Sequence, residues 1–232
     1  TSKPTANEIN FIIKLFNLNK LDEVKNQIDK DLKKYPNSAI LFDMLGVAYA
    51  QSKDIKNAEK NFRKAIEADS NYAHAYNNLG TLLYELKNLD EAIYYYEKAI
   101  NLNKDFVEAL VNIGCAKRLL NKSNEAIEFF KKVIKLKPNH TEAYNFLGVA
   151  YYDIGNKEEA LENLKKAIKI KPDYAEAYNH LGVVLRKLTR FDESLASYNK
   201  SIELNPNKEE VYNNLGGLYN NLGKFNEATQ AY

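Results

Sequence analysis

Histidine and cysteine are the side chains from which metal centres and nucleophilic sites are most often built, and this chain of 232 residues has only four of them. The histidines are His74, His140 and His180, and the cysteine is Cys115. A metal ion needs several donor atoms that converge to about 2–2.3 Å from one centre, and the spacing of these residues does not favour that convergence. No base accompanies the Cys115 thiol, so a small structural residue is favoured over a reactive nucleophile. We therefore expect no catalytic residue, no metal and no cofactor.

Hydrogen bonding to a peptide backbone is a second kind of chemistry, and the chain is rich in the residue that suits it. Each asparagine side chain offers an acceptor oxygen and two donor hydrogens, so it can pair with a peptide unit whatever the ligand's side chains are. Asparagines recur at intervals of 34 residues in two adjacent columns, one with Asn77, Asn145, Asn179 and Asn213, the other with Asn78, Asn112, His180 and Asn214. The pattern favours a track for an extended peptide. The alternative is a polar residue that is abundant in this chain and tolerated on a solvated face.

Tyrosine and arginine alternate at the same interval, as Tyr84, Arg118, Tyr152 and Arg186. These residue types are enriched among the side chains that dominate the binding energy of protein interfaces. We therefore add all four to the candidate peptide-binding residues. For the two tyrosines, packing against the following helix is the competing interpretation.

The elements that position these side chains follow from a strict repeat. Six glycines stand 34 residues apart, at Gly46, Gly80, Gly114, Gly148, Gly182 and Gly216. With the glycine as the eighth position, full repeats run over 39–72, 73–106, 107–140, 141–174 and 175–208, and an incomplete repeat runs over 209–232. A period between about 20 and 50 residues is typical of a solenoid, in which each unit packs on its neighbours. In this numbering the two asparagine columns are positions 5 and 6, and the tyrosine and arginine series is position 12.

Each repeat reads as two helices. Positions 4, 7, 8 and 11 have the three and four residue spacing of a helical stripe, and the small residues at positions 8 and 20 would let two helices cross closely. The second helix is expected to begin at an asparagine cap, as at Asn88 and Asn156. Prolines are expected to end it at Pro138, Pro172 and Pro206. Pairs four residues apart predict ion pairs on its solvated face: Glu59 with Arg63, Glu128 with Lys132, and Glu162 with Lys166.

The pattern resembles the tetratricopeptide repeat (TPR) over residues 39 to 232. The resemblance rests on large residues at position 4 (Phe42, Tyr76, Leu110, Tyr144, Tyr178, Tyr212), a Leu-Gly or Ile-Gly pair at positions 7 and 8, and a large residue at position 24 (Phe62, Tyr96, Phe130, Leu164, Tyr198, Tyr232). It implies an all-α, right-handed superhelical solenoid of antiparallel helix pairs. The first helices would line the inner wall and expose positions 2, 5, 6, 9, 12 and 13. Residues 1–38 are expected to form a divergent N-terminal repeat.

Composition narrows the partners. Thirty-three basic and 31 acidic side chains leave a formal charge of +2, whereas nucleic-acid binders concentrate positive charge, so we expect no nucleic-acid partner. No stretch approaches the 18 or more apolar residues of a membrane span. The cytoplasm is the default compartment, although Thr1 is not an initiator methionine and a signal segment could have been removed. The position of Tyr232 within a repeat predicts a fragment of a longer protein, and uncapped terminal repeats predict self-association end to end.

The expected function is a protein interaction module that holds a peptide or helical segment of a partner in its groove. Two alternatives remain: the substrate-recruiting arm of a larger glycosyl- or sulfotransferase, as in O-GlcNAc transferase-like proteins, and a self-assembling scaffold. The TPR clamp for the C-terminal carboxylate of heat-shock chaperones is not expected. It uses lysine at position 5 and asparagine at position 9, and here position 9 reads Val47, Thr81, Cys115, Val149, Val183 and Gly217.

Overall fold

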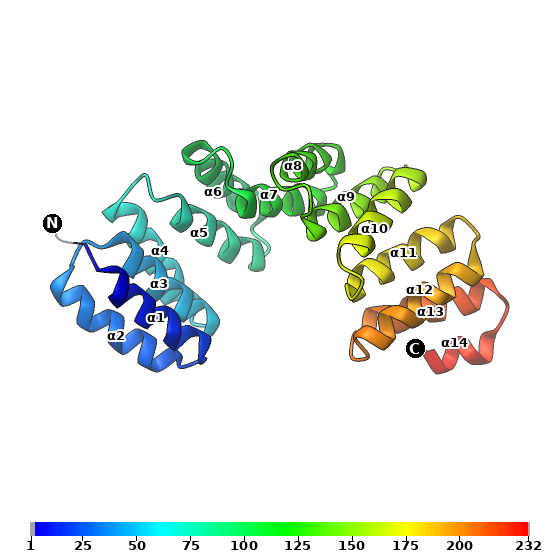
Figure 1. Ribbon diagram of the computed structural model, residues 1–232, viewed down its shortest axis with the longest axis horizontal. Coiled ribbons are helices and arrows are strands. Elements are labelled where there is room, and N and C mark those ends of the chain that lie inside the picture. Colours follow the sequence, from blue (N-terminus) through cyan, green and yellow to red (C-terminus); the bar gives the residue numbers. More distant parts are fainter. Residues whose placement is uncertain (1–2, 232) are drawn as a thin grey trace. The chain divides into compact units, whose positions relative to one another are not determined.

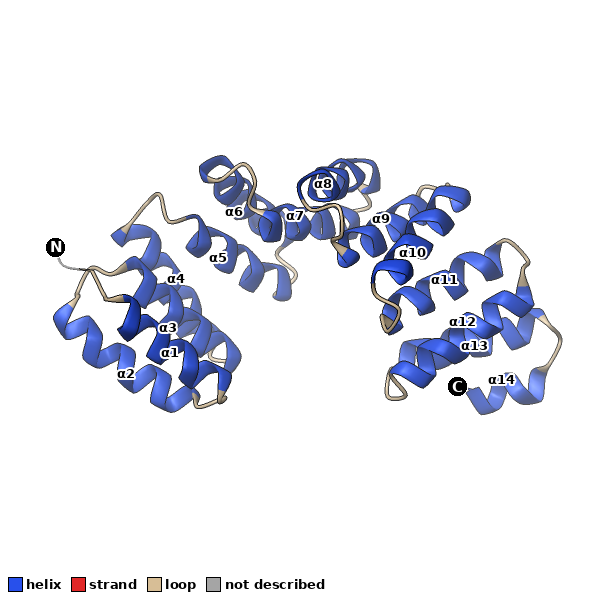
Figure 2. Cartoon of the chain, viewed as in Figure 1, coloured by secondary structure: helices blue, strands red, loops and turns tan. Residues whose placement is uncertain are grey.

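A computed structural model describes residues 3–231, which fold into fourteen helices without a strand (Figures 1 and 2). The helices are α1 (Ala6–Asn17), α2 (Leu21–Lys34), α3 (Ala39–Gln51), α4 (Ile55–Ala68), α5 (Ala73–Glu85), α6 (Leu89–Leu102), α7 (Val107–Leu119), α8 (Ser123–Leu136), α9 (Thr141–Asp153), α10 (Lys157–Ile170), α11 (Ala175–Lys187), α12 (Phe191–Leu204), α13 (Glu209–Asn221) and α14 (Phe225–Ala231). Each repeat from residue 39 thus begins with an odd-numbered first helix and continues with an even-numbered second helix, as the sequence predicts.

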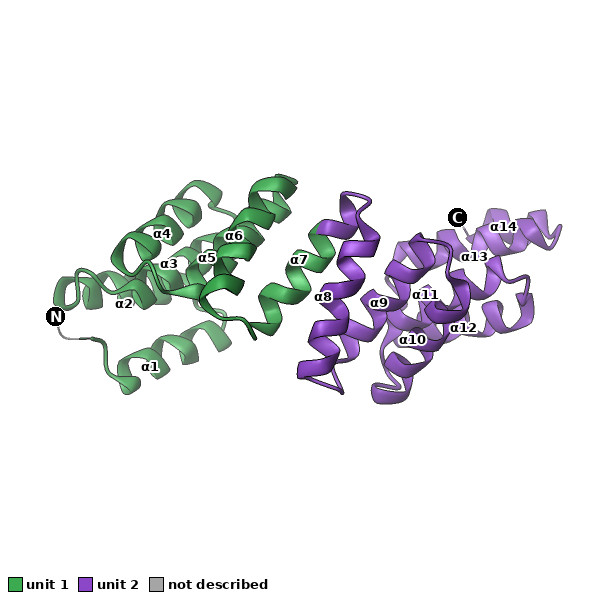
Figure 3. Cartoon of the chain, turned by 90° about the horizontal axis from the view of Figure 1, so that it is seen from above, with its two compact units in different colours: residues 1–116 green, residues 117–232 purple. Residues whose placement is uncertain are grey.

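The chain divides into two compact units, unit 1 with residues 1–116 and unit 2 with residues 117–232 (Figure 3). In unit 1, α3 packs on α4 and α5 on α6, and the first helices α3 and α5 also contact each other. In unit 2, α9 packs on α10, α11 on α12 and α13 on α14. The first helix α11 contacts both α9 and α13, so the three first helices of unit 2 form one continuous layer.

The periodic glycines lie where the two helices of a repeat meet, which confirms the prediction from residue size. A Cβ atom added to Gly46 would lie 2.6 Å from the ring of Phe62, and one added to Gly182 would lie 2.5 Å from the ring of Tyr198. Both rings are buried, so they have no room to move away. The alanines and serine at position 20 are buried as well, with exposed fractions between 0% and 2%: Ala58, Ala92, Ala126, Ala160, Ser194 and Ala228.

The turn between the first and second helices uses the same left-handed backbone each time. Position 15 has a positive φ in every repeat from residue 39, at Lys53, Lys87, Asn121, Gly155, Thr189 and Gly223. Asn19, between α1 and α2, has φ 54° and makes the same kind of turn. Glycine adopts this conformation without penalty, whereas a β-branched residue such as Thr189 adopts it rarely. The repeat geometry therefore imposes this backbone even where the local residue disfavours it.

Several local predictions are confirmed and others are wrong. The helices α8, α10 and α12 end two residues before Pro138, Pro172 and Pro206, as expected. The carboxylate of Glu59 lies 2.7 Å from Arg63, and Lys166 lies 2.7 Å from Glu162.

The remaining ion pair and the predicted caps differ in detail. Glu128 pairs with Lys131 at 3.3 Å, one residue before the predicted partner. The side chains of Asn88 and Asn156 do not cap their helices. The Asn88 amide instead donates to the Glu91 carboxylate at 2.6 Å, because the two side chains are close enough to bond each other directly.

Candidate functional site

The position 5 asparagines are buried, contrary to the expectation that they face a ligand from an exposed wall. The exposed fractions of Asn77, Asn145 and Asn179 are 8%, 0% and 1%. Only Asn213, in the last repeat, is exposed. The periodicity was correct, but the helix turns position 5 toward the next repeat rather than toward solvent.

The position 6 residues account for that burial, because each bonds to position 5 of the preceding repeat. Four such hydrogen bonds occur: Asn78 Nδ2 donates to Asp43 Oδ1 at 2.9 Å, Asn112 Nδ2 to Asn77 Oδ1 at 3.1 Å, Asn214 Nδ2 to Asn179 Oδ1 at 2.9 Å, and His180 Nδ1 lies 2.9 Å from Asn145 Oδ1. The two columns are therefore partners of each other. The position 6 side chains remain half-buried, so each keeps part of its surface on the first-helix face.

Two members of this series are titratable. Burial raises the pKa of Asp43 to about 6, and the hydrogen bond from Asn78 opposes that rise. Burial lowers the pKa of His180, against the opposing effect of the carboxylates of Glu176 and Glu210. Both groups therefore favour their neutral forms, which suit hydrogen bonding inside a helix layer.

A pocket of about 320 Å³ opens on the first-helix layer of unit 2. Its walls come from the last turn of α7 and from α9, α10, α11 and α13, and its lining residues are Arg118, Val149, Tyr152, Asp153, Leu164, His180, Val183, Val184, Glu210 and Asn214. Its volume lies in the range of about 300–1,000 Å³ that is usual for ligand pockets. Four of the predicted residues, Arg118, Tyr152, His180 and Asn214, thus come together in one place.

Other lining residues had no assigned role in the sequence. Val149 and Val183 occupy position 9, Asp153 occupies position 13 and Glu210 occupies position 2. These positions were expected on the inner wall, but only their combination in space shows that they share a pocket. A column-by-column comparison of the repeats could have grouped them.

The charges at the pocket are only partly balanced. Arg118 Nη1 lies 3.3 Å from Asp153 Oδ2, and both side chains are about 30% exposed, at 29% and 32%. Asn179 Nδ2 donates to Glu210 Oε1 at 3.1 Å. The hydroxyl of Tyr152 forms no hydrogen bond within the described part of the chain, and the same holds for the guanidinium of Arg186 beside it.

The predicted residues of unit 1 are arranged differently. Asn78 and Asn112 lie half-buried on α5 and α7 and bond as described above. Tyr84 is half-buried near the end of α5, and Lys87 lies 4 to 6 Å above its ring, at 5.9 Å from the centroid. A pocket of about 490 Å³ in this unit lies elsewhere, between the start of the chain and the α2–α3 loop, with Ile9, Tyr35 and Tyr72 in its walls.

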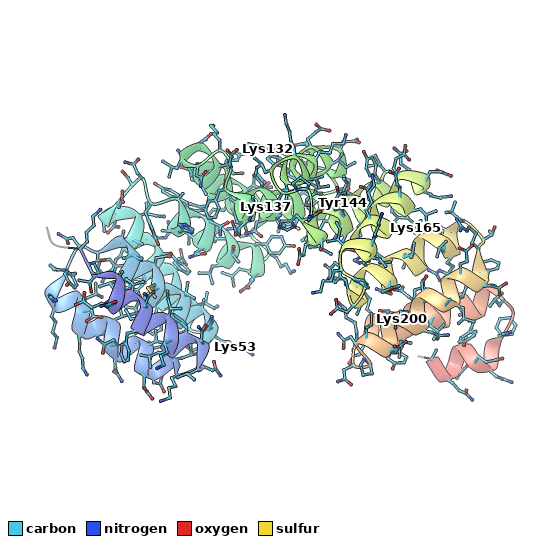
Figure 4. All side chains as sticks on the ribbon, viewed as in Figure 1. Lys53, Lys132, Lys137, Tyr144, Lys165 and Lys200 are labelled. Carbon is cyan, nitrogen blue, oxygen red and sulfur yellow. The ribbon has the colours of Figure 1, made fainter. Side chains whose placement is uncertain are left out.

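Within residues 3–231, no three His, Cys, Asp or Glu side chains are placed together as a metal would require. Cys115 is half-buried on α7. No helix in this range combines the length and the apolar character needed to cross a bilayer. The second helices carry exposed or half-buried lysines, among them Lys132, Lys165 and Lys200, labelled in Figure 4.

Comparison with known proteins agrees with this architecture. Models of the TPR repeat match residues 148–189 and 184–223, and models of the tetratricopeptide repeat match residues 41–72, 73–106 and 107–140. No match was found among curated proteins.

Solved structures give a similar result. MamA has 31% sequence identity, with 66% of this chain and 90% of MamA covered, and a TM-score of 0.56. YrrB, a TPR protein, has 22% identity, 79% and 95% coverage and a TM-score of 0.63. A tetratricopeptide repeat protein from Parabacteroides merdae has 16% identity, 97% and 89% coverage and a TM-score of 0.79. The chain therefore belongs to the tetratricopeptide repeat family.

Proposed function

We propose that this chain is a protein interaction module that binds a peptide segment of a partner on the first-helix layer of unit 2. The observation that carries the proposal is the pocket that brings Arg118, Tyr152, His180 and Asn214 together. It combines apolar walls with a few polar groups, which is the usual composition of a ligand site. YrrB, which has the same fold, has been described as having an unusual peptide-binding site, and this agrees with the proposed class of ligand.

The paired columns divide the work between support and contact. The buried amide of Asn179 holds Asn214 in a fixed orientation, and Asn145 does the same for His180. The bond from Asn214 uses one of its N–H groups, so its carboxamide oxygen and second N–H remain for a peptide unit. Because the contacting groups are fixed before the ligand arrives, less conformational entropy is lost on binding. Asn78 and Asn112 are held in the same way in unit 1.

Tyr152 is the best residue with which to test the proposal. It lines the pocket, its hydroxyl has no partner within the described residues, and it belongs to a residue type enriched among binding hot spots. Tyr144 lies on the same helix α9 but does not line the pocket, so it provides a matched truncation of the same residue type.

The experiment selects binders from a displayed library of random twelve-residue peptides and measures the affinity of the best one for three forms of the full chain. Tyr152→Ala should weaken binding about tenfold or more, and Tyr144→Ala should leave it within about twofold once both variants are shown to be folded. A library that yields no binder, or equal losses in both variants, would reject the pocket as a peptide site and favour a scaffold.

A further inference from the structure

Arg186, in the last turn of α11, carries a positive charge that the described part of the chain does not neutralise. Its guanidinium forms no hydrogen bond or ion pair there, and its Nε is enclosed without a partner. The side chain as a whole is half-buried. Polar groups removed from water are nearly always hydrogen-bonded, and charges are nearly always paired, so such a guanidinium requires an explanation.

The equivalent arginine two repeats earlier is paired. Arg118 also stands at position 12 and also has an enclosed Nε, but its Nη1 lies 3.3 Å from Asp153. Asp153 follows Arg118 by 35 residues. The residue that follows Arg186 by the same 35 positions is Asn221, which has no charge. The chain thus supplies an acid to one arginine of the series and leaves the other without one.

Gly217 lets the Arg186 guanidinium lie against the backbone of α13. A Cβ atom at residue 217 would collide with Nη1 of Arg186. Position 9 carries a side chain in every earlier repeat, from Val47 to Val183, so the glycine here makes a space that the guanidinium fills. Of the three guanidinium nitrogens only Nε is enclosed without a partner, which leaves Nη1 and Nη2 for an approaching ligand.

Tyr152 places this arginine at the pocket. Its ring lines the pocket, and Arg186 is close enough to oppose the rise in the pKa of Tyr152 that burial causes. The phenol hydroxyl can donate one hydrogen bond, and a guanidinium presents two parallel N–H groups whose geometry matches the two oxygens of a carboxylate. The two side chains together therefore offer donors and positive charge, whereas Arg118 is already neutralised by Asp153.

We propose that Arg186 and the Tyr152 hydroxyl bind a carboxylate of the peptide that occupies the pocket, so that the ligand is an acidic segment. The carboxylate belongs to an aspartate or glutamate side chain or to the C-terminus of the ligand. This inference rests on the proposed function and adds the chemistry of the ligand to it. Arg186 supplies the charge, Gly217 gives it room, and Asn221 leaves it unpaired in the free protein.

The test uses two libraries of twelve-residue peptides, one with amidated C-termini and one with free carboxylates, selected against the full chain. The variants are Arg186→Gln, which removes the charge, and Asn221→Asp, which supplies an internal acid at the place where Arg118 has one. The matched control is Arg118→Gln combined with Asp153→Asn, which neutralises the existing pair without changing the net charge. Circular dichroism and thermal unfolding check that all three variants are folded.

The expected result is enrichment of Asp or Glu at one position of the selected peptides, or selection only from the free-carboxylate library. Arg186→Gln and Asn221→Asp should each weaken the best peptide about tenfold or more, since a hydrogen bond to a charged group is worth about 1.5–3 kcal/mol. The control should stay within about threefold. The difference between the two libraries distinguishes a side-chain carboxylate from a terminal one.

Two outcomes would overturn the inference while leaving the proposed function intact. One is a set of tight peptides without an acid in either library, and the other is an acidic preference that survives both Arg186→Gln and Asn221→Asp. Absence of any selected peptide would reject the proposed function, and the inference with it.

Discussion

The side-chain amide of Asn214 donates to the carboxamide oxygen of Asn179 at 2.9 Å, across 35 residues of sequence. Asn179 is 1% exposed, so the bond lies in the packed layer between two first helices rather than on a free surface. The same offset joins Asn112 to Asn77. A column of asparagines that reads as a ligand track is therefore also part of what fastens one repeat to the next.

Removal of this bond should destabilise the protein. Asn214→Ala leaves the buried carboxamide oxygen of Asn179 without its donor, and we expect the free energy of unfolding to fall by about 1–2 kcal/mol. Urea unfolding followed by circular dichroism measures it. Asn213→Ala is the matched control, because Asn213 is exposed, and should change stability by less than about 0.5 kcal/mol. Equal effects of the two substitutions would show that the bond between repeats is not what stabilises this interface.

Asp43 should make the protein less stable as the pH rises. Its pKa is about 6 in the folded state against 3.8 for an ordinary aspartate, because burial penalises the charged form. The folded state therefore binds the proton more tightly, and stability falls between about pH 4 and pH 6 and stays lower above it. Asp43→Asn places at this position the residue that the later repeats use and keeps an acceptor for Asn78.

The variant should be more stable than the parent above pH 6, by at most about 3 kcal/mol, and indistinguishable from it at pH 4 or below. Urea unfolding at pH 4 and at pH 7.5 provides the comparison. A variant that is less stable at pH 7.5 would mean that the carboxylate is favoured in its site.

His180 should act in the opposite direction. Burial holds its pKa in the folded state below the ordinary value of 6.5, so as the pH falls below 6.5 the unfolded chain gains a proton that the folded chain does not. Stability attributable to His180 is therefore present above pH 6.5 and is lost on acidification. His180→Asn, which copies position 6 of the other repeats, should reduce this loss while leaving stability at pH 7.5 similar. A pH profile unchanged by the substitution would contradict the assignment.

Thr189 occupies a left-handed turn that disfavours it. Its φ is 58°, and the equivalent residues Gly155 and Gly223 are glycines with φ 85° and 71°. Thr189→Gly should therefore raise the melting temperature, with a gain of about 1 kcal/mol in the free energy of unfolding. Gly155→Ala should lower it by a similar amount, as the reverse change at the matching position. Scanning calorimetry tests both, and a destabilised Thr189→Gly protein would show that the turn carries no strain.

The sequence predicted the architecture well because the repeat states the same constraint six times. Gly182 and Tyr198 illustrate the reason: their size relation, 16 residues apart, recurs in every repeat, so one close contact is enough to explain both columns. Helix ends near Pro138 and Pro172 followed from local backbone restrictions in the same way.

The candidate site was less predictable because it depends on which way a side chain points. Positions 5 and 6 differ by one residue, about 100° around a helix, and that rotation buries Asn179 while leaving Asn214 half-buried. The pairing of Arg118 with Asp153 depends on an offset of 35 residues, one more than the repeat, which no single column reveals. The free guanidinium of Arg186 becomes meaningful only by contrast with that pair.

The most direct test of the peptide site is to follow the backbone amide resonances of the isotopically labelled full chain as a selected peptide is added. The shifts that change should cluster at the unit 2 pocket, at Tyr152, His180, Val183 and Asn214. Residues on the second helices, such as Lys165 and Lys200, should stay unchanged. Changes confined to the second helices, with none at the pocket, would contradict the account.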